Sequence, residues 1–397
     1  MAEENEDLTR KIPLQRGNFK DFHTCDGETV YRSKGTGIYC MQFQGFFKNQ
    51  EIDRLETGFY ADADIRVKKI KKCFVTNNNL IITSNGELLA QYGYHLFTVP
   101  TNPLKYGIKN KIDRVIRTGQ VGDFLVSDSV TIKKNGFYVG NTDNFGHWLF
   151  EFLPRVLWYK RLFPNQEIPL LIGEMVPNKW LEFLAPLGVD SSNVERFESY
   201  STIKYEELIV CSASCSRLPS GEPSLRLQDF FELRGLVSDY FKHISYDSNR
   251  LNCLFCTRKN ARWRKTVNED EAIEWLSSRF ETKVFEPENL SIKQQLELLG
   301  KAKFFFGAGA SIPMTMFSPH DSVLFEIRPP QGHGVVGRCW ADMFRFGYHR
   351  VAVDVHGEEG QKREKTMSAK FHEKDLIIDM DKFKKDVSEI VKMTELF

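Results

Sequence analysis

The chain has 397 residues, with 54 Lys and Arg against 53 Asp and Glu, so its formal net charge is +1. This length is too great for one ordinary domain and allows two, each with a substantial core. The balanced charge gives no general attraction to nucleic acid, so an anionic ligand needs a local cluster of cations. No apolar run approaches the ~18 residues of a membrane-spanning helix.

The N-terminal sequence, MAEENEDLTRKIPLQ, is acidic and polar where a signal peptide is basic and then apolar. We therefore expect a cytoplasmic protein. The eight cysteines are scattered. Their closest pairs, Cys211/Cys215 and Cys253/Cys256, lack the second pair or the histidines of a zinc finger, which favours reduced structural thiols.

The first 70 or so residues predict irregular β structure. Arg66–Lys72, RVKKIKK, holds five cations in seven residues. We interpret it as a solvated edge strand in preference to a surface for anionic lipid or a charged polymer. Between Cys73 and Leu89, Asn85-Gly86 separates two apolar runs and predicts a β-hairpin.

The stretch NTDNFGHWLFEFLP, residues 141–154, carries the first candidate site. A strand from Gly136 is expected to end at Gly140, and Asn144 is placed to cap the helix that follows. His147 and Glu151 are four residues apart and so share one helical face, just beyond a strand end where ligands bind in open α/β sheets. We therefore favour a functional histidine over a structural one. The core face is expected to hold Trp148, Phe152 and Val156.

Short apolar runs at 170–173 and 208–211 alternate with a helical stretch at 180–187, which is the pattern of a parallel sheet. A polar break at 220–223 and a helix from about 225 to 243 follow. We therefore expect an N-terminal domain at 1–235, a β-rich lead-in with a Rossmann-like half, and a second Rossmann-like domain at 236–397. The last helix is a candidate to pack back on the first domain.

The second domain is predicted to open with a strand, Leu251–Thr257, followed at once by the cation-rich stretch Arg258–Lys265. Cations directly after a strand are well placed for phosphate oxygens, and an arginine holds two of them at once. Nucleic acid stacking on Trp263 is the poorer alternative because the total charge is near zero. A solvated charged surface remains a further alternative. The candidate phosphate ligands are Arg258, Lys259 and Arg262.

The stretch Lys301–Ile327 is the most informative part of the chain. An apolar strand at Phe304–Phe306 breaks into Gly307-Ala308-Gly309-Ala310-Ser311, and a second strand follows at Val323–Ile327. A glycine turn between strand and helix lets a ligand approach the main chain and offers N–H groups to an anion. This predicts half of a nucleotide-binding βαβ layer. Small residues that pack a helix closely onto a sheet are the alternative.

The chain contains two Asp-x-Asp sequences, and this pattern holds the metal ion in one class of sugar transferases. Asp62-Ala63-Asp64 has no apolar strand before it. Asp379-Met380-Asp381 has one, but a helix at 382–397 follows, so Asp381 is expected to be its N-cap. We predict no metal site at either sequence.

Three stretches in this order resemble the family 61 glycosyltransferases: NFGHWLFEFLPR (144–155), CTRKNARWRKTVNEDE (256–271) and AKFFFGAGAS…VLFEI (302–327). That family includes plant and animal xylosyl- and N-acetylglucosaminyltransferases and bacterial proteins of capsular polysaccharide biosynthesis. The resemblance implies an α/β fold of two Rossmann-like domains facing across a cleft, the GT-B arrangement. It also implies transfer with inversion, without an obligatory metal or other cofactor, from a nucleotide-diphosphate sugar such as UDP-xylose or UDP-GlcNAc to a glycan or glycolipid hydroxyl.

The family's site residues carry over to matching positions. His147 and Glu151 match the family's histidine and the acid that follows it, and Arg258 matches the arginine of its Ser-Arg motif. Inversion in one displacement needs a base and positive charge at the leaving group, so we expect Glu151 to be the base, His147 to orient it or the acceptor, and Arg258 to contact the leaving diphosphate. The resemblance also implies a donor-side set of Asn144, Gly146, Arg258, Gly307, Ala308, Gly309 and Glu326. The cation-rich stretch and the glycine turn add Lys259, Arg262, Ala310 and Ser311 as further donor-side candidates. The chain departs from the pattern at Phe306, where the family usually has His, and by about two extra residues between Gly309 and Glu326. A non-catalytic nucleotide- or glycan-binding subunit and a metal-dependent transferase remain the alternatives.

Overall fold

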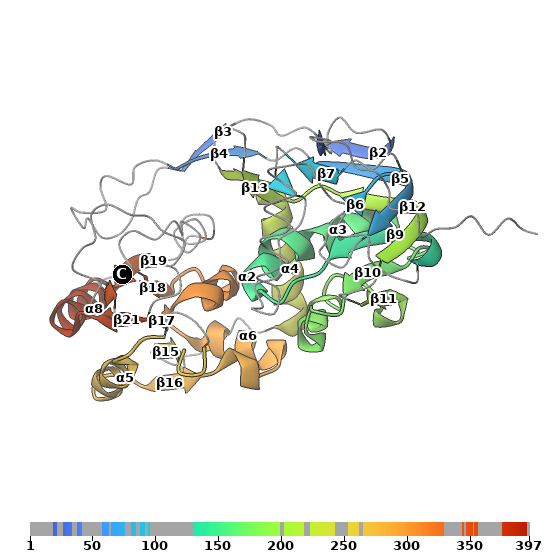
Figure 1. Cartoon of the computed structure of the whole chain (residues 1–397). Coiled ribbons are helices and arrows are strands. Elements are labelled where there is room, and N and C mark those ends of the chain that lie inside the picture. The colour runs from blue at the N-terminus through green and yellow to red at the C-terminus, as the bar shows by residue number, and fades with distance from the viewer. Residues whose placement is uncertain are drawn as a thin grey trace, which may run out of the picture. The chain divides into compact units, whose positions relative to one another are not determined.

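A computed structural model describes residues 19–21, 27–33, 38–41, 58–62, 65–75, 81–84, 88–91, 94–95, 130–198, 202–217, 223–242, 253–261, 265–328, 344, 347–351, 353–355 and 375–394. The chain forms two compact units. Unit 1 consists of Met1–Cys40 and Phe59–Leu236, and unit 2 of Met41–Gly58 and Val237–Phe397. Figure 1 labels the elements. The fold is mixed α/β with parallel strands in both units, as the alternating pattern predicted.

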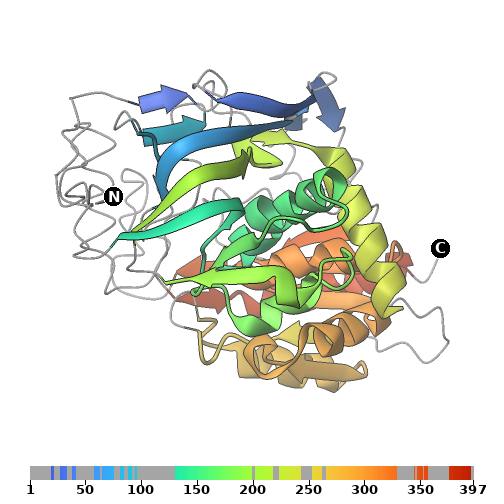
Figure 2. The ribbon, with the colours of Figure 1, turned by 90° about the vertical axis from the view of Figure 1, so that its right-hand side faces the viewer.

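Unit 1 is built on a ten-stranded mixed sheet. Its parallel part consists of β9 (Val130–Gly140), β10 (Leu170–Gly173), β11 (Val194–Phe197) and β12 (Thr202–Cys211). On the far side of β12 the sheet continues with β5 (Ile65–Val75), and Figure 2 shows these strands side by side. The other strands are β1 (Phe19–Asp21), β2 (Glu28–Ser33), β6 (Ile81–Ile82), β7 (Leu88–Gln91) and β8 (Tyr94–His95). A smaller sheet has the order β13 (Cys215–Arg217), β14 (Pro223–Leu225), β4 (Gly58–Asp62) and β3 (Ile38–Met41).

The edge-strand interpretation of Arg66–Lys72 is wrong. This segment lies in β5, which pairs with β12 on one side and with β2 and β6 on the other. Even Lys68 is only 4% exposed, and Lys69 lies 3.5 Å from Glu28 and 3.9 Å from Glu207 on the neighbouring strands. The predicted hairpin is confirmed by the antiparallel pair β6–β7, although Asn85 and Gly86 themselves lie outside the described residues.

A helical run follows β9 and covers the sheet. It consists of α2 (Phe145–His147), a π-helical turn η2 (Trp148–Phe152) and α3 (Leu153–Leu162). Trp148, Phe152 and Val156 are 0% exposed, so the predicted core face is confirmed. The predicted helix at 180–187 is a 3-10 helix, η3 (Asn178–Phe183), and a short 3-10 turn, η4 (Ser191–Asn193), precedes β11. Helix α4 (Leu227–Phe241) lies where the sequence predicted one.

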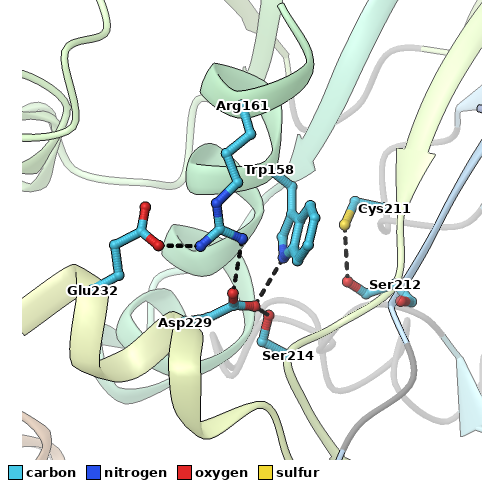
Figure 3. A network of polar contacts seen from close by, with 7 residues as sticks. All are labelled: Trp158, Arg161, Cys211, Ser212, Ser214, Asp229 and Glu232. Carbon is cyan, nitrogen blue, oxygen red and sulfur yellow. Dashed lines mark hydrogen bonds and ion pairs between the residues drawn. The ribbon is translucent and has the colours of Figure 1, made fainter. Parts of the chain in front are cut away.

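A buried polar network joins α3 to α4 (Figure 3). Asp229, in the first turn of α4, is 1% exposed and accepts hydrogen bonds from three side chains. Trp158 Nε1 donates over 2.8 Å and Ser214 Oγ over 2.6 Å to one carboxylate oxygen, and Arg161 Nη1 over 3.0 Å to the other. The second guanidinium nitrogen of Arg161 binds Glu232. The network therefore satisfies a buried carboxylate whose isolation would be costly.

Unit 2 contains a five-stranded parallel sheet of order β16-β15-β17-β18-β19. The strands are β16 (Thr282–Phe285), β15 (Cys253–Cys256), β17 (Phe304–Gly307), β18 (Val323–Ile327) and β19 (Gly347–Val351). The helical elements are α5 (Glu269–Ser277), η5 (Pro287–Asn289), α6 (Ile292–Lys301), the 3-10 helix η6 (Gly309–Phe317) and α8 (Met380–Thr394). Strand-helix alternation from β15 to β18 confirms the predicted βαβ layer, with η6 as the short crossover. Two further strands, β20 (Val353–Val355) and β21 (Leu376–Ile378), pair antiparallel.

One face of this sheet is covered by α5 and α8, and aromatic rings fill the space. The Phe306 ring stacks on Phe325 with centroids 4.5 Å apart and meets Phe383 of α8 edge-on at 5.8 Å. The buried face of α8, Phe383, Val387 and Ile390, belongs to the core of unit 2. Rings therefore hold the last helix to the sheet of its own unit.

The Asp-x-Asp sequence before α8 has the capping role that the sequence predicted, but at a different residue. Asp379 Oδ1 accepts from the Lys382 backbone N–H over 3.0 Å, and the helix already begins at Met380. The N-cap prediction for Asp381 is therefore wrong by two positions. In the other sequence, Ala63 and Asp64 lie outside the described residues. No helix in the described part of the chain is long and apolar enough to span a bilayer.

Candidate functional site

The first candidate group lies where β9 ends and α2 begins. Asn144 caps the helix as predicted, because its side-chain oxygen accepts from the N–H groups of Gly146 at 2.9 Å and His147 at 3.3 Å. Gly140 has φ of +133°, and a Cβ there would lie 2.1 Å from the Phe152 ring. A glycine is therefore required for η2 to pack so closely against the strand end. This close packing fixes where the helix starts relative to the sheet.

His147 and Glu151 form a direct contact on the helical face that the sequence predicted. The ring atom Nδ1 lies 2.7 Å from Glu151 Oε1, and the two side chains are 36% and 23% exposed. Burial disfavours the charged imidazolium, but the Glu151 carboxylate, with a smaller effect from Asp143, outweighs it and raises the pKa of His147. The pair therefore combines a half-exposed imidazole with a carboxylate that orients it.

Arg155 lies one further turn along and was not singled out from the sequence as a site residue. Its side chain is 0% exposed, its Nη1 donates to the Val139 carbonyl over 2.7 Å, and its guanidinium lies 5.1 Å from the centre of the Phe152 ring. Burial lowers the pKa of Arg155 to about 10, against the opposing effects of Cys211 and Glu151. One signal in the sequence could have identified Arg155: His147, Glu151 and Arg155 follow one another at intervals of four residues.

The second candidate group lies in unit 2, at the carboxyl ends of β15 and β17, which are neighbours in the sheet. Arg258 follows β15, and its Nη1 donates to the Ala308 carbonyl over 3.2 Å. Glu269, 2% exposed at the start of α5, accepts from the Thr257 hydroxyl and from the Arg258 backbone N–H at 3.1 Å. This buried acid holds the turn that presents Arg258. Neither Thr257 nor Glu269 was predicted from the sequence.

The Gly-Ala-Gly turn brings the start of η6 next to Arg258. A Cβ on Gly307 would lie 2.7 Å from the Phe305 ring and 2.8 Å from Ser311 Oγ, and Gly309 has φ of +62°. Small residues are therefore required here for packing. The sequence analysis gave such packing as the alternative to a ligand-binding turn. The same geometry leaves the first turn of η6 without a side-chain cap at Ala308. Backbone N–H groups at such an end favour an anion, so packing and anion binding are compatible.

The remaining donor-side candidates divide into three cases. Lys259 pairs with Asp270 at 2.5 Å, and both side chains are more than half exposed. Glu326 lies beside Gly307 in the sheet, is 5% exposed and accepts from the Tyr348 hydroxyl over 2.8 Å. Arg262 lies outside the described residues, and so does the side chain of Ala310. The structure therefore places Glu326 beside the turn, while Lys259 projects into solvent.

The predicted site residues thus form two groups, one in each unit. Asn144, Gly146, His147 and Glu151 are together in unit 1, and Arg258, Gly307–Ser311 and Glu326 in unit 2. Cys211, Cys215, Cys253 and Cys256 are free thiols. Within the part of the chain that the structure describes, no three His, Cys, Asp or Glu side chains gather as metal ligands would.

Residues 145–325 match the family model described as Glycosyltransferase 61. This segment of the chain belongs to the glycosyltransferase 61 family. Comparison with curated proteins found no match. The glycosyltransferase 61 segment runs from the first residue of α2 into β18 and contains most of both candidate groups. Asn144 and Glu326 lie one residue beyond its two ends.

Within the glycosyltransferase 61 segment, Phe306 replaces the histidine that is usual in the family. The structure places Phe306 in the ring-filled core, 0% exposed, between β18 and α8. Its side chain faces away from the turn at Gly307, because Gly307 and Phe306 are adjacent in a strand and alternate in direction. The Phe306 ring therefore packs against the rings of Phe325 and Phe383 in the core of unit 2.

Proposed function

We propose that the chain is an inverting, metal-independent glycosyltransferase. It would move a sugar from a nucleotide-diphosphate donor, a UDP-sugar such as UDP-xylose or UDP-GlcNAc, to a hydroxyl of a glycan or glycolipid. The observation that carries the proposal is the 2.7 Å contact between His147 and Glu151 at a strand end inside the glycosyltransferase 61 segment. A carboxylate-oriented imidazole is a suitable acceptor for the proton that such a transfer releases.

The proposed reaction is one displacement. The acceptor oxygen forms a bond to the anomeric carbon while the bond from that carbon to the diphosphate breaks, and its electron pair leaves with the nucleoside diphosphate. The acceptor's proton passes to the His147–Glu151 pair. We assign the proton of the neutral ring to Nδ1 because its partner is a carboxylate, which makes Nε2 the basic atom. We therefore favour His147 as the base and Glu151 as its orienting group, an exchange of the roles expected from the sequence.

The donor's diphosphate would lie at the group in unit 2. Arg258 would pair with phosphate oxygens, and the uncapped first turn of η6 would donate N–H groups to them. Charge develops on the leaving diphosphate in the transition state, so these groups would stabilise departure as well as binding. The short distance from Arg258 to the Ala308 carbonyl, 3.2 Å, supports a single site made by both turns.

Substitution of Arg258 by alanine is expected to weaken nucleoside diphosphate binding by roughly 1.5–3 kcal/mol, the usual contribution of a hydrogen bond to a charged group. Titration calorimetry with UDP measures this as a rise in Kd. Arg279→Ala is the matched control, because Arg279 is an exposed arginine of the same unit that lies over the Trp275 ring, 4.9 Å from its centre. An unchanged Kd in the Arg258 variant would remove Arg258 from the donor site.

A transfer assay tests the function itself. The chain is incubated with UDP-, GDP- and CMP-sugars and a set of glycan acceptors, with and without EDTA, and product anomers are identified by NMR. Product of inverted configuration, formed equally with EDTA, supports the proposal. Loss of turnover with EDTA points to the metal-dependent alternative. Donor binding with neither transfer nor donor hydrolysis points to the non-catalytic subunit.

We extend the proposal to the GT-B arrangement of the two units, which the resemblance to the family supports. We also propose a cytoplasmic location, which the acidic and polar N-terminal sequence supports. Cleft closure brings groups from two domains onto one substrate and excludes water. Saturating UDP-sugar is therefore expected to reduce the radius of gyration measured by small-angle scattering. An identical scattering profile with and without a donor that calorimetry shows to bind would count against closure. Cell fractionation tests the location.

A further inference from the structure

The strand order of the sheet in unit 2 indicates where a ligand binds. The first strand of this sheet in the chain, β15, has the second and third strands, β16 and β17, on its two sides. In open α/β sheets of this order, ligands bind where the direction of strand addition reverses, beyond the carboxyl ends of the first and third strands. Arg258 and the Gly-Ala-Gly turn follow these two strands. The next strand along, β18, brings a second polar group to the same edge of the sheet.

This second group consists of Glu326, Arg328 and Tyr348, from the end of β18 and from β19. Glu326 is the register partner of Gly307, and a Cβ on Gly307 would lie 2.8 Å from Ser311 Oγ of η6. Paired residues of neighbouring parallel strands point to the same face of a sheet. The Glu326 side chain therefore lies on the face that η6 covers. The Tyr348 hydroxyl donates to Glu326 Oε2 over 2.8 Å, and Arg328 Nη1 lies 3.9 Å from the same oxygen.

The Arg328 guanidinium is close to Glu326 without a hydrogen bond to it. Their separation exceeds the roughly 2.7–3.2 Å of an N–H···O hydrogen bond. The Arg328 side chain is 14% exposed, and its Nε is buried with no acceptor among the described residues. Burial raises the pKa of Tyr348, and the Glu326 carboxylate adds to the rise, so this hydroxyl stays a donor that holds the carboxylate. The pair therefore offers a held acceptor and an arginine with unused donors.

The chemistry of this pair suits a hydroxyl group. A hydroxyl both donates and accepts, so one oxygen can accept from Arg328 and donate to Glu326. Two atoms 3.9 Å apart can each lie about 2.8–3.0 Å from an oxygen placed between them. A phosphate oxygen carries negative charge, and the Glu326 carboxylate would repel it. Sugar hydroxyls are neutral and meet both requirements.

We propose that Arg328 and Glu326 bind hydroxyl groups of the nucleotide-sugar donor, with Tyr348 as the residue that holds the carboxylate in place. This inference deepens the proposed function and rests on it, because a diphosphate at Arg258 and the Gly-Ala-Gly turn brings the hydroxyls within reach. Only β17 separates β15 from β18, so the two arginines follow strands about 10 Å apart. A diphosphate with its attached sugar spans that distance. The transferred sugar and the ribose both carry such hydroxyls.

Calorimetric titration of the full chain tests the inference and separates these two sources. The probes are UDP, UDP-GlcNAc, UDP-xylose and 2′,3′-dideoxy-UDP, which lacks the ribose hydroxyls. If the transferred sugar is bound, Arg328→Met is expected to raise the Kd of the UDP-sugars by roughly 10- to 100-fold and to leave that of UDP within about twofold. If the ribose is bound, the same variant weakens UDP and the UDP-sugars alike and leaves dideoxy-UDP unchanged.

Two results would overturn the inference. Unchanged Kd values for all four probes would show that Arg328 only neutralises Glu326. An equal rise in Kd for UDP and dideoxy-UDP would show that Arg328 contacts phosphate and not hydroxyl groups. The matched control is Arg279→Met, because Arg279 is an exposed arginine of the same unit that lies over the Trp275 ring. It should change none of the four Kd values.

Loss of Arg328 leaves Glu326 without a nearby cation, so the variant is checked first by its melting temperature. If Arg328→Met does not fold, Arg328→Met/Glu326→Gln replaces it, because this pair of substitutions removes both charges together. The same pattern of Kd changes is expected, since both partners of the hydroxyl are lost.

Arg258→Ala, titrated in parallel, separates failure of this inference from failure of the proposed function. If Arg258→Ala weakens UDP binding while Arg328→Met changes no Kd, the proposed diphosphate site stands and the inference about Arg328 is wrong. A parent chain that binds none of the four probes would reject the UDP-sugar donor of the proposed function, and this inference with it.

Discussion

Replacing Glu151 with glutamine is expected to lower turnover by roughly 10²–10⁴, the usual contribution of a positioned acid or base. Glutamine keeps the size of the side chain, so folding and donor binding should survive. Its amide can donate to His147 Nδ1, which would hold the ring in the tautomer whose Nε2 carries the proton and cannot accept one. The measurement is kcat at saturating donor and acceptor, beside UDP affinity by calorimetry.

The comparison variants for Glu151→Gln are His147→Gln and Glu182→Gln. His147→Gln should lose at least as much turnover, because it removes the proposed base itself. Glu182 is a half-buried acid of η3 in the same unit, outside the site, and its substitution should leave turnover within a few-fold of the parent. Turnover in Glu151→Gln within a few-fold of the parent would reduce the His147–Glu151 contact to a structural one.

Replacing Asp229 with alanine is expected to destabilise unit 1 by about 3–5 kcal/mol, the cost of breaking a buried charged network from one side. Trp158, Ser214 and Arg161 all donate to this carboxylate, and all three would lose their acceptor (Figure 3). For a unit of this size the melting temperature should fall by on the order of 10 °C. Thermal unfolding followed by circular dichroism measures it.

The control for Asp229→Ala is Glu232→Gln, which breaks the outer contact of the same Arg161. The Glu232 side chain is 37% exposed, and exposed ion pairs contribute little, about 0–1 kcal/mol. Its melting temperature should therefore stay within about 3 °C of the parent. Equal falls in melting temperature for the two variants would show that the buried Asp229 carboxylate stabilises the fold no more than the exposed Glu232 carboxylate.

Local signals in the sequence located much of the fold and part of the site. Apolar runs ending in glycine predicted β9 and β17, and a further apolar run predicted β18. The Asn144 cap and the His147–Glu151 face follow from helical spacing alone. These features depend on residues close together in the chain. Patterns of this kind are strong because sterics and hydrogen bonding decide them locally.

The features that the sequence did not predict depend on distant partners. The cation-rich segment of β5 is an inner strand because β12, more than a hundred residues later, pairs with it. Charged residues are normally exposed, so the burial of Arg155 and Glu269 depends on the carbonyl of Val139 and the turn at Thr257. Such contacts exist only once the chain has folded.

The C-terminal segment decides how fragments of this protein can be made. Strand β21 exchanges backbone hydrogen bonds with Lys265 and Val267, of 2.7 and 2.8 Å, and the side chain of Asn268 binds both the N–H and the carbonyl of Ile378. These contacts lie between Arg258 and helix α5, while Phe383 of α8 covers Phe306. A fragment cut at residue 325, where the family match ends, would expose that ring and release the segment after Arg258. A fragment intended to keep unit 2 folded therefore has to extend through α8, because the limits of a family match are not the limits of an autonomously folding piece.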